Sequence, residues 1–148
     1  MIPDDIFMRI LIQLVLAALF GVVIGIEREH RRKAAGMRTY ALVCMGAALF
    51  TILSVDGFRS LVSENGYDPS RIASQIVVGI GFIGGGLIFL QGNKVQGLTT
   101  AAALWVTAAI GMTVGIRMYA VAAAATFLTL CIIWLFRFIE AYVPRAED

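Results

Sequence analysis

The sequence has few charged side chains: Asp, Glu, Lys and Arg together make up 15% of its 148 residues, whereas a soluble domain carries roughly 25%. Apolar residues make up 59% of the chain and gather in long blocks, and about 20 mostly apolar residues suffice to cross a bilayer. These features exclude an ordinary soluble domain and predict a protein whose main partner is the lipid bilayer. The net charge of only +2 does not indicate a nucleic-acid partner, and we expect none.

Cysteine and histidine are also scarce. The two cysteines, Cys44 and Cys131, lie inside apolar segments without CxxC spacing, which favours small buried thiols over a structural zinc site. The only histidine, His30, stands in a basic loop, and a serine or cysteine hydrolase would need another one. We therefore expect no enzyme activity and no resident cofactor.

The apolar residues form five segments, which predict an all-α, polytopic membrane bundle of about five transmembrane helices. The segments lie near residues 6–26, 39–55, 72–91, 98–116 and 118–138, and only Arg117 marks the boundary between the last two. The first segment follows an acidic start and is too long for a signal peptide, so we expect an uncleaved span. Residues 1–148 are expected to form one transmembrane domain.

Basic residues between the segments indicate an orientation, because cytoplasmic loops are enriched in Lys and Arg. If the five spans alternate in direction, eight basic residues fall on one side and four on the other. The eight are Arg28, Arg31, Arg32, Lys33, Arg38, Lys94, Arg137 and Arg145, and the four are Arg9, Arg59, Arg71 and Arg117. We therefore expect the N-terminus outside and the C-terminus in the cytoplasm.

The sequence GIGFIG (Gly79, Gly81, Gly84) fits the dinucleotide fingerprint G-x-G-x-x-G. Such a site needs a strand-to-helix turn and an acidic residue about 20 positions later. Here apolar residues flank the glycines, and the next carboxylate after Asp68 is Glu140, so the pattern favours close helix packing. Glycines on two faces predict that the third helix is central in the bundle. The glycines expected at helix contacts are Gly21, Gly25, Gly79, Gly81, Gly85, Gly111 and Gly115.

Small residues also recur at every fourth position of the fourth segment. They are Thr99, Ala103, Thr107, Gly111 and Gly115. We expect a homodimer or small homo-oligomer that forms through a glycine face, with the fourth helix as the first candidate.

Charged residues gather where the first segment ends and the second begins. The predicted cluster on the cytoplasmic side consists of Glu27, Arg28, Arg38 and Thr39. A tight helical hairpin would let Glu27 pair with Arg38, and also with Arg31 if the first helix continues by one more turn. A lipid-facing basic loop is the alternative. That alternative applies above all to Arg31, Arg32 and Lys33.

A second polar group precedes the third segment. Asp68 suits an N-cap and Pro69 the first helical position, and Arg71 and Gln75 continue along the same face towards Gly79. This outer face either lines an entrance for a polar solute, or caps the helix while Gln75 and Gln13 make hydrogen bonds between helices. Asp68 is the candidate metal ligand on this face.

Three segments resemble the membrane domain of the MgtC/SapB family: EREHRRKAAGMRTYALVCMGAALFT, DPSRIASQIVVGIGFIGGG and GLTTAAALWVTAAIGM. The resemblance runs from about Gly21 to Gly115. It implies a bacterial inner-membrane protein associated with magnesium homeostasis and, in some members, with survival in hosts. It assigns signature positions to Glu27, Arg28, Gly36, Arg38, Thr39, Asp68, Arg71, Gln75, Gly79, Gly81, Thr99, Thr100 and Trp105.

The chain departs from the family pattern in two respects. Ala35 stands where many members have proline, which is expected to loosen that loop. Longer members carry a soluble C-terminal domain that these 148 residues do not contain, so functions of that domain are not expected to transfer.

Two functions remain open. Members of the family are often named as magnesium-transport proteins, yet some resemble regulators that act on other membrane machines, including ATP synthase. The small-residue stripes and the absence of charge in mid-span favour a non-enzymatic regulator that binds another membrane protein. The polar face at Asp68 and Gln75 and the cluster at Glu27 and Arg38 favour the alternative, an oligomeric channel or transporter for magnesium or another ion.

Overall fold

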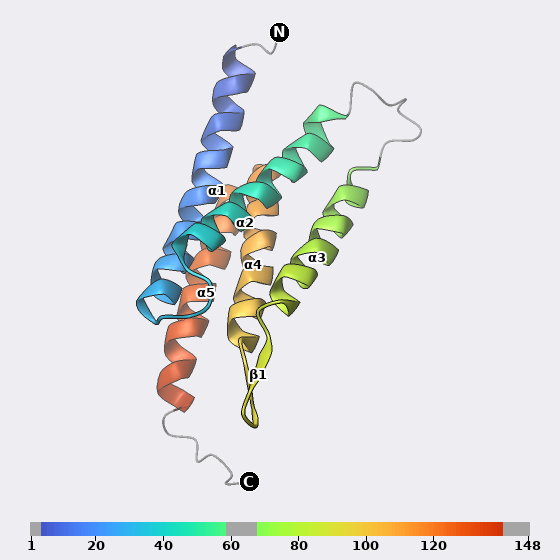
Figure 1. Ribbon diagram of the computed structural model, residues 1–148. Coiled ribbons are helices and arrows are strands. Elements are labelled where there is room, and N and C mark those ends of the chain that lie inside the picture. Colours follow the sequence, from blue (N-terminus) through green and yellow to red (C-terminus); the bar gives the residue numbers. More distant parts are fainter. Residues whose placement is uncertain (1–3, 59–67, 141–148) are drawn as a thin grey trace.

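The structure is a computed structural model, and it describes residues 4–58 and 68–140. Five α-helices make up most of these residues (Figure 1). They are α1 (Asp4–His30), α2 (Met37–Ile52), α3 (Ser70–Gly85), α4 (Leu98–Gly115) and α5 (Tyr119–Glu140). A π-helical turn, η1 (Leu53–Gly57), continues α2, and a hairpin of two strands, β1 (Phe89–Gln91) and β2 (Lys94–Gln96), separates α3 from α4.

The predicted all-α membrane bundle is confirmed. Within the described residues, four helical segments are long and apolar enough to cross a membrane: α1, α2 together with η1, α4 and α5. α4 and α5 are separate helices, because the chain turns at Arg117, whose φ of 67° is incompatible with a continuing helix. α3 has only 16 residues and is about 24 Å long at roughly 1.5 Å per residue, whereas a hydrocarbon core is about 30 Å thick.

The predicted extent of the third helix, 72–91, is wrong at its C-terminal end. α3 ends at Gly85, where glycines 84–86 remove helix propensity. The apolar residues that follow form β1, which pairs with β2 in antiparallel register, Leu90 opposite Val95. Hydropathy alone does not distinguish a short apolar strand from the continuation of an apolar helix.

The expectation that this glycine-rich helix is central is also wrong. α4 is the central element and packs against α1, α2, α3 and α5, whereas α3 packs mainly on α4 and α2 at the edge of the bundle. A methyl group added at Gly79, Gly81 or Gly85 would meet no atom within 4 Å. Glycine permits close packing, but the neighbour here approaches α3 at other positions, Ile80 and Gly84, which are buried.

Close helix contacts occur instead at four other predicted glycines. A methyl group added to Gly25 of α1 would lie 2.6 Å from the Cα of Met37, and one added to Gly21 would strike the carbonyl group of Tyr40. The two remaining glycines belong to α4. Gly111 lies against the carbonyl oxygen of Cys44, and a methyl group on Gly115 would come within 2.6 Å of the Cβ of Thr51.

This packing changes the expected dimer interface. Because α2 covers Gly111 and Gly115 within the same chain, the glycine face of α4 is not free to join two copies. A homodimer remains our expectation, through another face.

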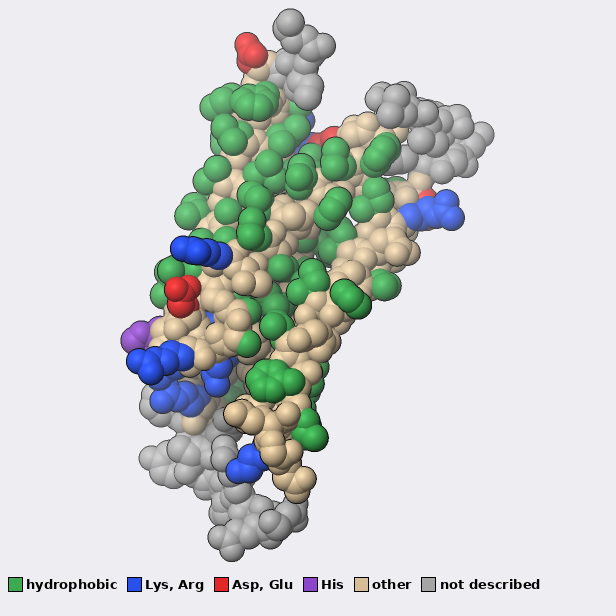
Figure 2. All heavy atoms as spheres, in the orientation of Figure 1, with side chains coloured by type: hydrophobic (Ala, Val, Ile, Leu, Met, Phe, Trp, Pro, Cys, Tyr) green, Lys and Arg blue, Asp and Glu red, His purple; other side chains and the backbone are tan. Residues whose placement is uncertain are grey.

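The helices alternate in direction, so that the start of α1 and the end of α5 lie at opposite ends of the bundle (Figure 1). The α1–α2 connection, the hairpin and the end of α5 lie together at what we call the loop end, and η1, the start of α3 and the α4–α5 turn lie at the opposite end. On the face seen in Figure 2, hydrophobic side chains cover the middle, and most Lys and Arg side chains gather near the loop end. Arg59 and Arg145, which were part of the predicted charge count, lie outside the described residues.

Candidate functional site

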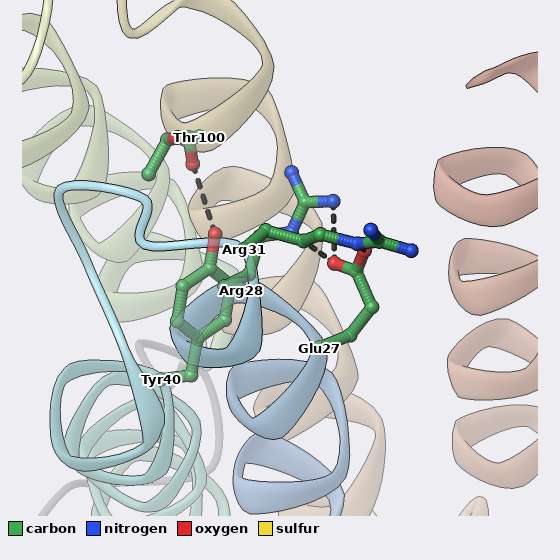
Figure 3. Close-up of polar contacts among 5 residues, drawn as sticks. All are labelled: Glu27, Arg28, Arg31, Tyr40 and Thr100. Atoms are coloured by element: carbon green, nitrogen blue, oxygen red, sulfur yellow. Dashed lines mark hydrogen bonds and ion pairs between the residues drawn. The ribbon is translucent and has the colours of Figure 1, made fainter.

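An ion cluster occupies the loop end of α1. The helix extends to His30, beyond the predicted residue 26, and therefore carries Glu27 and Arg28 in its last turn. Arg28 Nε donates a hydrogen bond of 2.5 Å to Glu27 Oε2, and Arg31 Nε lies 3.5 Å from Glu27 Oε1. Figure 3 shows both guanidinium groups turned towards this carboxylate. The side chains of Arg28 and Glu27 are only 5% and 18% exposed, so one carboxylate stabilises two neighbouring cations in a largely dehydrated place.

Tyr40 connects α2 with α4 close to this cluster. Its hydroxyl donates a hydrogen bond of 3.2 Å to the carbonyl oxygen of Thr100 (Figure 3). The bond connects the first turn of α2 with the first turn of α4 and is buried. Sequence reasoning placed Thr100 at a signature position and did not single out Tyr40. A tyrosine inside an apolar segment, whose hydroxyl needs a partner, was the available signal.

The predicted pair between Glu27 and Arg38 is wrong. The Glu27 carboxylate forms ion pairs with Arg28 and Arg31 instead, both of which are close to it along the chain. The additional pair of Glu27 with Arg31, which required a longer first helix, is confirmed. Arg38 and Thr39 instead line a separate polar pocket between the end of α1 and the start of α2.

At the opposite end, Asp68 forms a local cap before α3. Its Oδ1 accepts hydrogen bonds from Ser70 Oγ at 2.6 Å and from the Ser70 amide at 3.0 Å. These bonds, first that of the hydroxyl and then that of the amide, lower the pKa of the Asp68 carboxyl, and the nearby Arg71 adds to the shift. Pro69 precedes the first helical residue, Ser70, so the predicted helix start is displaced by one position.

An apolar groove of about 750 Å³ runs between α2 and α3. Gln75 and Gly79 line it from α3 and Gly46 from α2, while Asp68 and Arg71 stay exposed at the start of α3. The Gln75 side chain has no hydrogen-bond partner within residues 4–58 and 68–140. The structure therefore places Gln75 and Gly79 in one groove, but it does not extend the polar lining beyond Gln75.

Gln13 contrasts with Gln75. It is fully buried, and its Nε2 donates hydrogen bonds of 3.0 Å each to the carbonyl oxygens of Val114 and Gly115. Of the two hydrogen bonds between helices that one reading of the sequence predicted, the bond of Gln13 is thus confirmed, whereas the described residues show none for Gln75.

The remaining family positions have different environments. Gly36 precedes α2 and touches the Glu29 side chain, whereas Thr99 and Trp105 are exposed on α4.

The described residues hold no preassembled cluster of metal ligands within one chain. They contain no group of three or more His, Cys, Asp or Glu side chains close enough to hold a metal ion. The candidate ligand Asp68 already accepts two hydrogen bonds from Ser70 on one carboxylate oxygen. A magnesium ion bound at Asp68 would need further oxygen ligands, either from another chain or from water molecules that the ion retains.

These features define a small polytopic membrane protein: a five-helix bundle with a buried ion cluster at one end and an apolar groove at its side. The family model of the MgtC family matches residues 14–142, and the chain belongs to that family.

Curated relatives agree. Over 128 residues the chain is 48% identical to "Putative magnesium transporter YhiD" of Escherichia coli. This match covers 85% of this chain and 60% of that protein. The chain is 45% identical over 121 residues to protein MgtC of Salmonella typhimurium, and 46% identical over 121 residues to protein MgtC of Brucella abortus. These matches cover 82% of this chain and 49% and 48% of those proteins, so the chain spans about half of their length. No solved structure matches.

Proposed function

We propose that this chain is a non-enzymatic regulator linked to magnesium homeostasis, and that it acts in the bacterial inner membrane by binding a transmembrane helix of another protein. The observation that carries this proposal is the apolar groove between α2 and α3. Lipid tails can fill an apolar groove, but they cannot bond the unpaired amide of Gln75, and an unsatisfied polar group in a bilayer costs several kcal/mol. A partner helix supplies both apolar contact and a hydrogen-bonding group.

The distribution of charge supports the same proposal. The stretches 10–26, 39–55, 72–85, 98–115 and 119–136 contain no Asp, Glu, Lys or Arg. Proteins that move ions usually place ionisable groups along the path, and a single chain of this protein offers no Asp, Glu, Lys or Arg within these stretches. The family resemblance makes ATP synthase the first partner to examine.

Affinity purification from native membranes tests the proposal. Gly79 lines the groove, whereas Gly81 lies on the same helix outside it, and a methyl group at either position meets open space. Wild type and Gly81→Leu should recover the same partner at a constant ratio, and Gly79→Leu should lose it because its side chain fills the groove. Failure to recover a stoichiometric partner, or equal recovery by both variants, would count against the proposal.

Transport of magnesium is the second candidate, favoured by the name of the YhiD relative and by the polar face from Asp68 to Gln75. One carboxylate per chain becomes a ring of carboxylates in a symmetric oligomer. Purified protein in liposomes, assayed for magnesium and proton flux, separates the two functions. Flux above that of empty vesicles, reduced by Asp68→Asn, supports transport; flux equal to that of empty vesicles supports the regulator.

The proposed orientation places the loop end in the cytoplasm, because the Lys and Arg residues gather there. A single cysteine introduced at Lys33 in a Cys-free background should not react with a membrane-impermeant thiol reagent in spheroplasts whose inner membrane is intact. A cysteine at Asp5 should react.

A further inference from the structure

The polar pocket at the loop end has a volume of about 510 Å³. It is formed by the end of α1, the connection and the first turn of α2, and is lined by Glu29, Arg32, Lys33, Gly36, Arg38 and Thr39. Three cations and one carboxylate therefore face a single cavity. It lies where two spans end, next to the ion cluster and separate from it.

The Glu29 carboxylate offsets only one of the three positive charges and forms no ion pair with any of these cations. Glu29 Oε2 accepts a hydrogen bond of 2.9 Å from the Met37 amide and so caps the start of α2. Within residues 4–58 and 68–140, the side chains of Arg32, Lys33 and Arg38 form no ion pair or hydrogen bond. By contrast, Arg28 and Arg31 are both paired with Glu27. The pocket therefore carries an excess of two positive charges, and a bound anion would reduce the repulsion among the three cations.

We propose that this pocket binds a phosphate group. A phosphate carries several oxygens and more charge than a carboxylate, which suits a site with two guanidinium groups, an ammonium group and the Thr39 hydroxyl. Glycine at position 36 leaves room beside the Glu29 side chain, since a methyl group there would lie 2.7 Å from Glu29 Oε2. The phosphate belongs either to an anionic lipid headgroup, which reaches this depth at the membrane surface, or to a soluble phosphate compound. The site does not depend on whether the protein regulates or transports.

The test compares two doubly substituted proteins that lose the same charge. Lys33→Gln with Arg38→Gln removes two cations from the pocket. Lys94→Gln with Arg137→Gln removes two exposed cations that do not line it. Arg38→Lys keeps the charge of the pocket and serves as the rescue variant. Circular dichroism and size-exclusion chromatography establish that each protein is folded before binding is measured.

Two arms distinguish the sources of phosphate. In the lipid arm, each protein is placed in nanodiscs that contain spin-labelled phosphatidylglycerol or spin-labelled phosphatidylcholine. Electron spin resonance then measures how much of each labelled lipid the protein immobilises. In the soluble arm, nanodiscs of phosphatidylcholine alone are dialysed against radiolabelled inorganic phosphate at constant ionic strength. A preference for phosphatidylglycerol identifies a headgroup, and retention of inorganic phosphate identifies a soluble compound.

In either arm, wild type, Arg38→Lys and the Lys94/Arg137 control should bind alike. The Lys33/Arg38 double variant should lose the lipid preference, or bind inorganic phosphate roughly tenfold or more weakly, as expected for two surface cations. Binding by wild type in neither arm overturns the proposal. An equal loss in both double variants also overturns it, because it would reduce the effect to overall charge.

Discussion

Asp56 and Arg117 form an ion pair across the opposite end of the bundle, with 2.5 Å between Asp56 Oδ2 and Arg117 Nη2. The pair connects η1, which continues α2, with the turn between α4 and α5. Arg117 makes this contact from a left-handed backbone conformation, with a φ of 67°. One residue thus ends α4, starts the return of the chain and fixes the end of α2.

The first prediction separates these roles of Arg117. Both residues of the pair are one third or more exposed, so Arg117→Ala should lower the free energy of unfolding by only about 0.5–1 kcal/mol. Arg117→Gly loses the same ion pair but relieves the left-handed strain, and it should be more stable than Arg117→Ala by about 1 kcal/mol. Unfolding in detergent with a chemical denaturant measures both. Equal stability of the two variants would show that backbone strain at this turn is negligible.

The second prediction concerns the two kinds of glycine. Gly111→Ala should lower the free energy of unfolding by about 1–3 kcal/mol, because its methyl group would overlap the Cys44 carbonyl oxygen. Gly81→Ala meets open space and should stabilise α3 by about 0.5–1 kcal/mol through helix propensity. The same denaturant unfolding checks the opposite signs. A loss of stability in Gly81→Ala would mean that its face is covered, for example by a second copy.

The contrast between α3 and α4 shows where sequence reasoning succeeds. Hydropathy was enough to show where each of the five helices lies, because a bilayer requires long apolar segments, but it did not give the end of the shorter α3. The spacing of glycines identified surfaces that permit close approach, but not which neighbour occupies them, since this depends on the order in which helices pack. In α4, Gly111 and Gly115 lie directly against α2, and the helix also packs on α1, α3 and α5. In α3, by contrast, a methyl group at Gly79, Gly81 or Gly85 would meet open space, and Gly79 lines the groove towards α2.

The third prediction follows from the lowered pKa of Asp68. Because the folded-state pKa lies below the ordinary value of 3.8, the carboxylate stabilises the start of α3 above that pH. This stabilisation is lost as the pH falls through the folded-state pKa. Ser70→Ala removes the largest cause of the shift, so the pKa should rise towards its ordinary value, and Arg71→Gln should raise it less. Carboxyl carbon NMR measures all three proteins, and an identical pKa in wild type and Ser70→Ala would contradict the assignment.

The candidate site was only partly predictable. Glu27 and Arg28 stood out because charged groups at the ends of spans need partners, and Thr100 stood out only through the family resemblance. The choice of those partners did not follow from spacing. It depends on one extra helical turn in α1, which brings Arg31 beside Glu27 and leaves Arg38 to the neighbouring pocket. Likewise, 61 residues separate Asp56 from Arg117, and only the packing of α2 on α4 brings them together.

The fourth prediction tests whether the ion cluster holds the loop end together. Glu27→Gln leaves the 5%-exposed Arg28 side chain without its carboxylate and should cost about 3 kcal/mol of unfolding free energy. Glu29→Gln is the matched control two residues away: its amide oxygen can still accept the Met37 hydrogen bond, so the effect should be small. Replacing both partners, Glu27→Gln with Arg28→Met, should recover part of the loss, because no unpaired buried charge remains. If the double variant were less stable than Glu27→Gln alone, Arg28 would be stabilised by contacts other than Glu27, and the cluster would be a consequence of the packing of α1 rather than one of its causes.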